Sequence, residues 1–480
     1  MTRFFGRVRR VHFVGIGGVG MCGLAEILQN LGCQVSGSDV HESATLERLR
    51  GLGVAVSIGH DGTNLSDADV VVVSSAIRAG NPEVREAERR YVPVIPRAEM
   101  LAEIMRMKEG IAVAGSHGKT TTTSLIAHVL DAVGLDPTAV IGGRVRGSAG
   151  DPQAATTGAR LGRGDLLVAE ADESDGSFLH LAPVIAVITN VEAEHLDHWG
   201  SYEALLEGFA AFANRVPFFG AAVVGLDDAG VRQLLPRLTR RTVTYGLSVQ
   251  ADFVATEIEA QGSAMRFHVR RGGDRLGEVS VPLPGRHNVQ NALACLAVAT
   301  LADVRFRDAA DALESFRGVE RRFETKGSVA GIRVVDDYGH HPTEIRATLA
   351  AARGLHSGRI VVVFQPHRYT RTQDLFEAFT DAFHDADRLL VTGIYGAGEE
   401  KIPGVESAVL VDAIRARGHR HVDLVADLEQ VPDVLVPELR KGDLVITLGA
   451  GNVTRLGPAI LAKLREGQAD GPGPAAGPKP

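Results

Sequence analysis

The chain has 480 residues, a length that predicts about three domains, each able to bury its own core. Hydrophobic residues make up 45% and charged residues 23%, which excludes a disordered or collagen-like chain. The formal net charge is −8, so no overall basic field exists to bind nucleic acid or an anionic membrane. An anionic ligand must instead be held by backbone N–H groups, helix N-termini and single basic side chains.

Cysteine usage and hydropathy favour a soluble protein of the cytoplasm. Cys22, Cys33 and Cys295 form no C-x-x-C pair and are too few for a disulfide framework. Near the N-terminus, glycines and Glu26 interrupt the apolar run, so a strand, a turn and a helix explain it better than a signal peptide. No window approaches about 18 uninterrupted apolar residues, and we therefore expect no transmembrane helix.

Residues 1–107 are expected to form a doubly wound α/β domain. Short apolar runs typical of buried parallel strands alternate here with stretches of helical spacing. The expected strands begin at Val11, Cys33 and Asp69, and the expected helices cover 21–31, 45–52 and 97–107. The same alternation starts again after residue 107, where we place the first boundary.

Residues 108–321 are expected to form a central domain. Its buried strands should begin at Ile111, Asp165, Val184 and Ala221. A more alternating stretch over 251–281 predicts antiparallel strands, and a helix near His287 follows.

Residues 322–466 are expected to form a third α/β domain, with the boundary in the segment 320–323. Its strands should begin at Ile332, Arg359, Asp387 and Asp443. Residues 467–480 are rich in Pro, Gly and Ala and have no apolar period, so we expect a disordered tail.

A glycine-rich turn follows the first expected strand. Gly15–Gly20 reads GIGGVG and opens a helix, and Asp39 ends the next strand. Such glycines let a backbone approach a pyrophosphate, and such an acid accepts hydrogen bonds from a ribose. The motif alone fits NAD, FAD or another nucleotide diphosphate such as a UDP-sugar, and it also fits a purely structural turn.

A second glycine loop, Gly115–Thr121 with the sequence GSHGKTT, lies between a strand and a helix. Its amides can surround phosphate oxygens, Lys119 can neutralise phosphate charge, and the Thr120 hydroxyl can reach Mg²⁺. Val113 occupies the position of the first glycine of the usual phosphate loop. The context on both sides still predicts ATP binding, which weakens a dehydrogenase interpretation of the first domain.

Acidic residues follow two buried strands of the central domain. Glu170–Asp175 reads EADESD, and Thr189–Asp197 reads TNVEAEHLD. The carboxyl ends of parallel strands are where α/β folds bind ligands. Glu173 could be a metal ligand or a base that positions water, and His195 could be a Mg²⁺ ligand. Alone, the acids could be solvated and the histidine structural.

Two further segments flank the second boundary. Asn288 and Asn291 lie three residues apart, on one face of a helix, where amides can bind an adenine edge. N-capping is the alternative for Asn288. Arg322 lies at the expected hinge, where a mobile guanidinium could contact a γ-phosphoryl group, although Arg321 and Arg322 could simply be a surface pair.

Two motifs of the third domain follow neighbouring expected strands. Asp336–Pro342 reads DDYGHHP, and Phe364–Arg371 reads FQPHRYTR. Both should face one crevice, where His and Arg side chains suit a carboxylate substrate and a titrating group. A zinc site is disfavoured, because no Cys or suitably spaced third ligand accompanies the histidines.

Together, motifs from about Val11 to Arg455 resemble those of the Mur ligases. These are GIGGVGM, SSAI (from Ser74), GSHGKTTT, EADESD, TNVEAEHLD, LPGRHNVQNALA, GVERRFE, DDYGHHPTE, FQPHRYTRT and GAGN. The resemblance implies an α/β protein with three domains. They are an N-terminal Rossmann-like domain for a UDP-sugar, a central P-loop ATPase domain with a mainly parallel sheet, and a C-terminal Rossmann-like domain for an amino acid.

The resemblance implies roles for individual residues. The sugar nucleotide would be bound by Gly15, Gly17, Gly18, Gly20, Asp39 and Ser74. ATP would be bound by Gly115, Ser116, His117, Gly118, Lys119, Thr120, Thr121, Asn288, Asn291, Arg322 and Asp337. Thr120 and Glu173 would bind one Mg²⁺ and His195 a second. Tyr338, His340, Arg368 and Arg371 would surround the amino acid and the acceptor carboxylate. The implied catalytic residues are Lys119, Glu173, His195, Arg322 and His340.

The motifs are most similar to those of the members that join L-alanine to UDP-N-acetylmuramate. In that reaction the γ-phosphoryl of ATP would pass to the lactyl carboxylate, and the alanine amine would attack the acyl phosphate. We expect these small-molecule substrates, ATP and Mg²⁺, no nucleic-acid or membrane partner, and a monomer or weak dimer.

Departures from the family pattern are Ser116 and Glu194, where Thr and Asp are common. Because no lysine lies between Thr120 and Thr325, the carbamylated lysine of sister ligases is absent from this stretch. The alternatives are a nicotinamide or flavin oxidoreductase, a folylpolyglutamate synthetase, a ligase that adds a whole tripeptide to the same sugar nucleotide, and a nucleotide-gated regulator. Gly18 favours addition of a single amino acid over the tripeptide.

Overall fold

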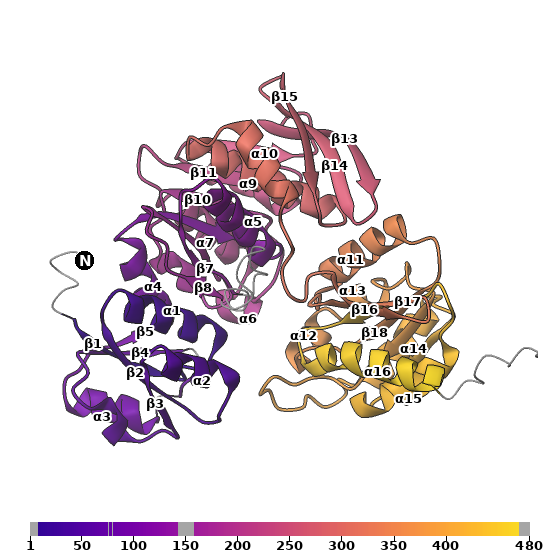
Figure 1. The fold of residues 1–480 in the computed structure, drawn as a ribbon, viewed down its shortest axis with the longest axis horizontal. Coiled ribbons are helices and arrows are strands. Elements are labelled where there is room, and N and C mark those ends of the chain that lie inside the picture. The colour runs from indigo at the N-terminus through magenta and orange to yellow at the C-terminus, as the bar shows by residue number, and fades with distance from the viewer. Residues whose placement is uncertain (1–7, 75, 79, 143–157, 470–480) are drawn as a thin grey trace, which may run out of the picture. The chain divides into compact units, whose positions relative to one another are not determined.

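The computed structural model describes residues 8–74, 76–78, 80–142 and 158–469. The chain forms two compact units (Figure 1). The larger unit contains the described residues up to 258, together with 266–282 and 288–319. The smaller unit contains 259–265, 283–287 and the described residues from 320 onward. The three sheets are mainly parallel, which confirms the expected α/β class. The three domain boundaries stay a prediction.

The first sheet has the strand order β3-β2-β1-β4-β5, and each neighbouring pair is parallel. Its strands are β1 (Arg10–Val14), β2 (Gln34–Asp39), β3 (Ala55–Ile58), β4 (Val70–Val73) and β5 (Val94–Pro96). Its helices are α1 (Val19–Asn30), α2 (Ala44–Gly51), α3 (Pro82–Arg89) and α4 (Arg97–Met105). The order reverses direction at β1, so the crevice for a ligand opens at the carboxyl ends of β2, β1 and β4.

The central sheet has ten strands in the order β15-β14-β13-β12-β11-β10-β6-β9-β7-β8. Strands β12 to β7 in this order pair in parallel, and β7 and β8 are antiparallel. The strands are β6 (Glu109–Ala114), β7 (Thr138–Val140), β8 (Ala159–Arg160), β9 (Leu166–Glu170), β10 (Ile185–Ile188), β11 (Ala221–Gly225), β12 (Thr242–Gly246), β13 (Phe253–Gln261), β14 (Ala264–Arg271) and β15 (Asp274–Val281). Strands β13, β14 and β15 are joined by short turns and follow one another in the sheet, an arrangement that agrees with the expected antiparallel strands.

The helices of this part of the chain are α5 (Lys119–Ala132), α6 (Leu196–Trp199), α7 (Tyr202–Ala213), α8 (Ala229–Leu234), α9 (Arg286–Leu301) and α10 (Phe306–Glu314). Helix α5 packs on the sheet through Leu125, Ile126, Val129 and Leu130, which are buried at a helical spacing. The strands β10, β6 and β9 are neighbours, so the loops that follow them meet at one edge of the sheet.

The third sheet has the order β16-β17-β21-β18-β19-β20 and is parallel except for β16. Its strands are β16 (Glu324–Val329), β17 (Ile332–Asp337), β18 (Ile360–Phe364), β19 (Arg388–Val391), β20 (Val422–Leu424) and β21 (Leu444–Leu448). Its helices are α11 (Pro342–Leu355), α12 (Tyr369–Asp374), α13 (Phe376–Thr380), α14 (Ser407–Ala416), α15 (Val431–Leu435) and α16 (Leu456–Ala469).

The C-terminal helix extends beyond the expected end of the folded chain. Helix α16 continues to Ala469, so residues 467–469, which we expected in the disordered tail, are helical. The rest of that predicted tail, 470–480, lies outside the described residues.

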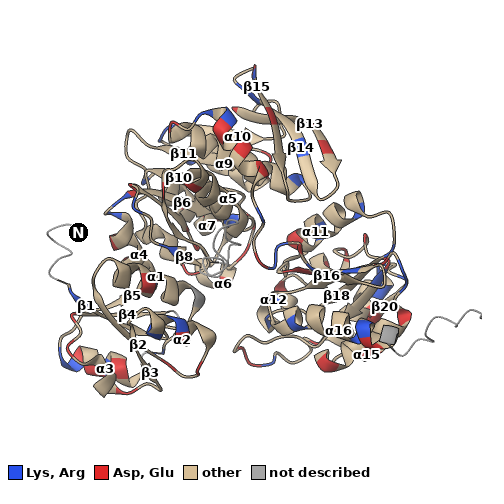
Figure 2. Ribbon diagram, in the orientation of Figure 1, with Lys and Arg blue, Asp and Glu red and all other residues tan. Residues whose placement is uncertain are grey.

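The central strands carry the cores: β6, β10, β11, β18 and β21 are buried along nearly their whole length and rich in Val, Ile, Leu and Ala. Acidic and basic residues are intermixed along surface helices such as α2 and α3 (Figure 2). In the described part of the chain, no helix is both long and apolar enough to span a bilayer.

Candidate active site

The glycine turn after β1 is held against the end of β2. The N–H groups of Gly15 and Ile16 both donate to the Ser38 carbonyl at 2.9 Å, and Gly15 has a φ of +79°. The Gly17 N–H donates to Asp39 Oδ2 at 2.8 Å, and a Cβ at Gly17 would lie only 2.8 Å from that oxygen. The structure therefore brings the turn and Asp39 together, and a side chain at position 17 would displace the carboxylate from the backbone N–H.

Ser74 lies at the carboxyl end of β4, on the other side of this turn. Its Oγ is 3.6 Å from the position that a Cβ would take at Gly15. The predicted sugar-nucleotide residues therefore line one edge formed by β2, β1 and β4, and their contact with a nucleotide stays a prediction.

The phosphate loop joins β6 to α5 and is braced by the loop after β10. The His117 N–H donates to Asn190 Oδ1 at 2.8 Å, and Asn190 Nδ2 donates to the His117 carbonyl at 3.0 Å. The Glu192 N–H donates to Ser116 Oγ at 2.8 Å. A Cβ at Gly115, which has a φ of +131°, would lie 2.0 Å from Thr189 Oγ1. This loop is thus fixed before any ligand binds.

Lys119 begins α5 and points into the acidic side of the site. Its Nζ donates to Glu173 Oε1 at 2.8 Å, to the Gly115 carbonyl at 2.6 Å and to the Ser116 carbonyl at 3.2 Å. Burial opposes the charge, but Glu173 and two other carboxylates outweigh it and raise the pKa of Lys119. The ammonium is therefore fully charged at neutral pH.

Carboxylates outnumber cations around this lysine. Glu173 is 2% exposed, and burial, with the charge of Asp172, raises its pKa to about 7 in spite of Lys119. Glu170 Oε1 accepts a hydrogen bond from Thr120 Oγ1 at 2.9 Å. One ammonium thus faces the three acids Glu170, Asp172 and Glu173. The local charge deficit suits a divalent cation.

A cluster with metal-binding chemistry lies beside the phosphate loop. Ligand atoms of Glu173, Glu194 and His195 lie within 4.8 Å of one another. His195 adopts a left-handed φ of +55° immediately before α6, which sets its position on the loop after β10. Two carboxylates and one imidazole provide suitable ligands, so these residues fit a Mg²⁺ ion. Glu194, which we had regarded only as a departure from the family pattern, belongs to this cluster.

Asn288 and Asn291 lie on the first turns of α9, next to α5. Asn291 Nδ2 donates to Asn288 Oδ1 at 3.1 Å, and Thr122 Oγ1 donates to Asn291 Oδ1 at 3.1 Å. A Cβ at Gly118 would lie 2.9 Å from Asn291 Oδ1. The two amides therefore lie directly behind the phosphate loop, and their contact with adenine stays a prediction.

In the smaller unit, Asp337 is a buried anchor at the end of β17. Its Oδ2 accepts the Phe323 N–H at 2.7 Å, and its Oδ1 accepts the Gly339 N–H at 2.8 Å and the Thr348 hydroxyl at 3.2 Å. Burial raises the pKa of this carboxyl. Oδ2 thus holds the segment around Arg322, and Oδ1 holds the loop after β17 and helix α11. A contact of Asp337 with a ribose stays a prediction.

Arg321 and Arg322 differ in their surroundings. Arg321 Nη2 donates to the Gly449 carbonyl at 2.5 Å, and its Nε lies 3.3 Å from Asp336 Oδ2. Arg322 Nη1 lies 3.7 Å from Glu344 Oε1, and its guanidinium lies over the Tyr338 ring at 5.2 Å. The Arg321 guanidinium also lies over the Tyr338 ring, at 4.9 Å, so both arginines flank Tyr338. They differ in that Arg321 bridges to Asp336 and the Gly449 backbone, whereas Arg322 contacts Glu344.

The loops after β17 and β18 bring two histidines together. The His340 and His367 rings are 5.8 Å apart, and Arg371 Nη1 is 3.2 Å from His367 Nδ1. Arg368 instead pairs with Glu399 at 2.8 Å. The structure therefore brings His340, His367 and Arg371 together, and their contact with a substrate stays a prediction.

Burial keeps these histidines neutral. It lowers the pKa of His340 to about 3, and burial with Arg371 lowers that of His367 to about 4. His287, also in the smaller unit, has its pKa lowered to about 4 by burial and by Arg322. At neutral pH the positive charge of this site therefore comes from its arginines.

Two residues of the larger unit were not singled out from the sequence. Asn190 fixes the phosphate loop, and Glu170 receives the Thr120 hydroxyl. Both stand within motifs that the sequence had indicated. Their position at or near the carboxyl end of a buried strand was the available signal, because that is where α/β sheets present ligand-binding side chains.

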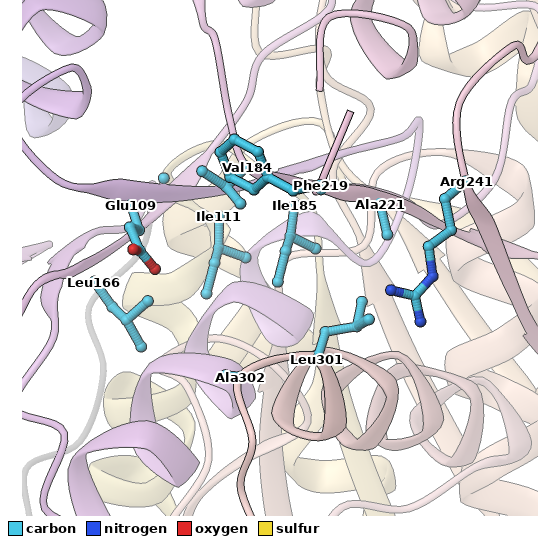
Figure 3. Close-up of a pocket in the computed structure, with 12 residues that line it drawn as sticks. Glu109, Ile111, Leu166, Val184, Ile185, Phe219, Ala221, Arg241, Leu301 and Ala302 are labelled. Atoms are coloured by element: carbon cyan, nitrogen blue, oxygen red, sulfur yellow. The ribbon is translucent and has the colours of Figure 1, made fainter. Parts of the chain in front are cut away.

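A pocket that is partly open to solvent lies at the opposite edge of the central sheet. Side chains at the starts of β6, β9, β10 and β11 line it, with Glu109 and Arg241 at its two ends (Figure 3). The phosphate loop follows the other end of β6. The pocket is therefore separate from the candidate active site.

Comparison with known proteins agrees with this geometry. Three family models match, described as Mur ligase family catalytic domain over residues 10–109, Mur ligase middle domain over 113–299, and Mur ligase glutamate ligase domain over 321–451. A curated relative, the UDP-N-acetylmuramate–L-alanine ligase of Geotalea daltonii, is 56% identical over 96% of this chain and 99% of its own length.

The chain is also similar over nearly its whole length to solved structures of ligases. The UDP-N-acetylmuramate-alanine ligase of Thermotoga maritima has a TM-score of 0.80 at 29% identity, covering 95% of this chain and 99% of that one. A murein peptide ligase of Psychrobacter arcticus has a TM-score of 0.70 at 25% identity, covering 95% and 98%.

Proposed function

This chain belongs to the Mur ligase family, and from that premise we propose that it joins L-alanine to UDP-N-acetylmuramate at the expense of ATP. The products are UDP-N-acetylmuramoyl-L-alanine, ADP and phosphate, and the reaction is the first amino-acid addition in peptidoglycan precursor synthesis. The 56% identity to a curated L-alanine ligase over nearly the whole chain supports L-alanine and UDP-N-acetylmuramate as the two substrates that are joined.

The proposed chemistry rests on one observation. Lys119, at the end of a phosphate loop that neighbouring residues hold in place, donates from its Nζ to Glu173 Oε1 at 2.8 Å. Such a loop binds a triphosphate through backbone N–H groups and a fixed ammonium, which is what ATP-dependent transfer needs. An oxidoreductase would leave this loop without a role, and three Mur ligase models match the chain.

The first step transfers the γ-phosphoryl group from ATP to a lactyl carboxylate oxygen, and ADP leaves. Both reactants are anions, so catalysis consists largely of positioning and neutralisation of charge. Lys119 supplies one fixed positive charge next to the phosphates. Thr120, Glu173 and His195 would hold Mg²⁺, with two ions proposed, and bound Mg²⁺ supplies further charge that offsets the repulsion.

In the second step the uncharged alanine nitrogen attacks the acyl carbon, phosphate leaves with the former carboxylate oxygen, and the proton lost by the nitrogen passes to the released phosphate or to water. Arg371 and Arg368 suit the substrate carboxylates, because a guanidinium can bind a carboxylate through two hydrogen bonds. Arg322 suits the transferred phosphoryl group. His340 has a pKa of about 3, so it is a weak base, and we favour a contact with the amino acid over the role of proton acceptor.

We further propose a cytoplasmic monomer or weak dimer. Cys22, Cys33 and Cys295 are free and buried, which suits a reducing compartment. Sedimentation of the purified protein over a range of concentrations would measure the assembly state.

A phosphate-release assay tests the proposed function. We expect release only when ATP, UDP-N-acetylmuramate and L-alanine are all present, with mass spectrometry showing one added alanine. Full-rate ATP consumption without either acceptor would refute the proposal. Faster turnover with the tripeptide than with alanine would identify the recycling reaction instead.

A further inference from the structure

Glu83 is the centre of a buried polar network in the first sheet domain. It lies in the first turn of α3, and its side chain is 0% exposed. Its Oε2 accepts a hydrogen bond from the Ser38 hydroxyl at 2.6 Å, and its Oε1 accepts one from Asn64 Nδ2 at 2.6 Å. His60 Nδ1 lies 3.1 Å from Oε2. A carboxylate with this set of partners is held rigidly.

Both branches of the network lead to the end of β2, which holds the glycine turn. Ser38, bound through its hydroxyl, uses its carbonyl to accept the N–H groups of Gly15 and Ile16 at 2.9 Å each. Asn64 Nδ2 also donates to the Gly59 carbonyl at 3.1 Å, and the Gly59 N–H donates to the Asp39 carbonyl at 2.8 Å. Glu83 thus fixes the end of β2 from two sides.

Helix α3 does not need this carboxylate for its own N-terminus. The Asn81 side chain already accepts the Glu83 N–H at 2.9 Å and caps the helix. Burial disfavours the ionised form, but the nearby His12 imidazole, whose Nε2 lies 3.7 Å from Oε1, and the hydrogen bonds from Ser38 and Asn64 outweigh it and lower the pKa of Glu83 to about 2. A buried carboxylate needs hydrogen bonds to compensate for its lost hydration. Here those bonds come from Ser38 and Asn64, which also hold the end of β2 next to the turn.

We propose that Glu83 is a positioning residue of the sugar-nucleotide site, one that holds the Gly15–Gly17 turn and Asp39 in the geometry that binds the diphosphate and ribose. This inference rests on the proposed function, because it takes the sugar nucleotide as the ligand of that turn. Glu83 itself does not touch the ligand and acts through Ser38 and Asn64.

The test is the Glu83→Gln variant, which preserves shape but replaces one acceptor oxygen by a donor. We expect the KM for UDP-N-acetylmuramate to rise at least about 10-fold, the scale of losing a hydrogen bond to a charged group. The KM values for ATP and alanine should stay within about twofold of wild type, because their sites depend on other sheets. Glu88→Gln, an exposed residue of the same helix, is the matched control and should change none of them.

A merely structural role predicts a different result. Glu83→Gln would then lower the melting temperature while the folded enzyme kept its normal KM for the sugar nucleotide, and that outcome would overturn the proposal. An equal rise in all three KM values would overturn it too. If Glu83→Gln does not fold, Ser38→Ala, which removes only the linking hydroxyl, is measured by the same criteria.

Calorimetric titration of UDP-N-acetylmuramate separates this inference from the proposed function. Wild-type protein that binds the sugar nucleotide, with variants that bind it equally well, would refute the role of Glu83 alone. Wild-type protein that does not bind it would refute the proposed function, and the role of Glu83 with it.

Discussion

Replacing Lys119 by alanine should abolish most activity while leaving the protein folded. The change removes the one ammonium that the phosphate loop presents to the triphosphate. Loss of one preorganised charge from an active site costs about 3 to 4 kcal/mol of transition-state stabilisation, so kcat should fall at least ~100-fold.

The stability loss can be estimated from the contacts of Lys119. Its bonds to the Gly115 and Ser116 carbonyls contribute about 1 kcal/mol each. Glu173 does not become an unpaired charge, because burial raises its pKa and favours uptake of a proton once the ammonium is gone. The free energy of unfolding should therefore fall by only about 2 to 3 kcal/mol.

The two effects are separated by measuring single-turnover phosphate release together with urea unfolding. Lys108→Ala is the matched control, because Lys108 Nζ also donates to backbone carbonyls, those of Gly162 and Gly164, far from the phosphate loop. It should lose similar stability and keep its kcat. A Lys119→Ala enzyme with kcat within about threefold of wild type would contradict the reasoning.

Further predictions concern charge and pH. Glu194→Gln should weaken Mg²⁺ binding about 10-fold or more, seen as a smaller rise in melting temperature with added Mg²⁺; an unchanged rise would remove Glu194 from the cluster. Burial raises the Glu173 pKa from 4.5 to about 7, so in ligand-free wild type the folded state holds this proton more tightly than the unfolded state. The free energy of unfolding that this group contributes is therefore lost as pH rises from 4.5 to about 7. Glu173→Gln should therefore become more stable relative to wild type from pH 4.5 to 7, and a pH-independent difference would contradict it. His340 has its pKa lowered from 6.5 to about 3, so its contribution is lost as pH falls; His340→Gln should unfold at lower pH and raise the alanine KM, and unchanged acid unfolding and kinetics would exclude both roles.

Much of the site was predictable because the motifs follow buried strands. In the third sheet, the expected strands from Ile332, Arg359 and Asp443 are β17, β18 and β21, which are neighbours. Their carboxyl ends therefore meet, as the parallel pattern predicted. Edge strands such as β16 and β20 were missed, since they are short, partly exposed and lack a continuous apolar run.

The distinction between similar neighbours needed the structure. Arg321 and Arg322 are adjacent in the chain, but only the structure shows that Arg321 bridges to the Gly449 carbonyl. Glu194 looked like a deviation until the fold placed it beside Glu173 and His195. No motif in the sequence indicated a role for Glu83.

The amino-acid sequence by itself determined the alternation of strands and helices and the loops that carry the chemistry, because apolar periodicity and glycine positions are local properties of the chain. Only the tertiary structure decided which side chains meet. Lys119 and Glu173 are 54 residues apart, and their 2.8 Å contact exists because β6 and β9 are neighbours in the sheet. Strand order is set by packing of the whole chain, so contacts made across it are not encoded in any single segment.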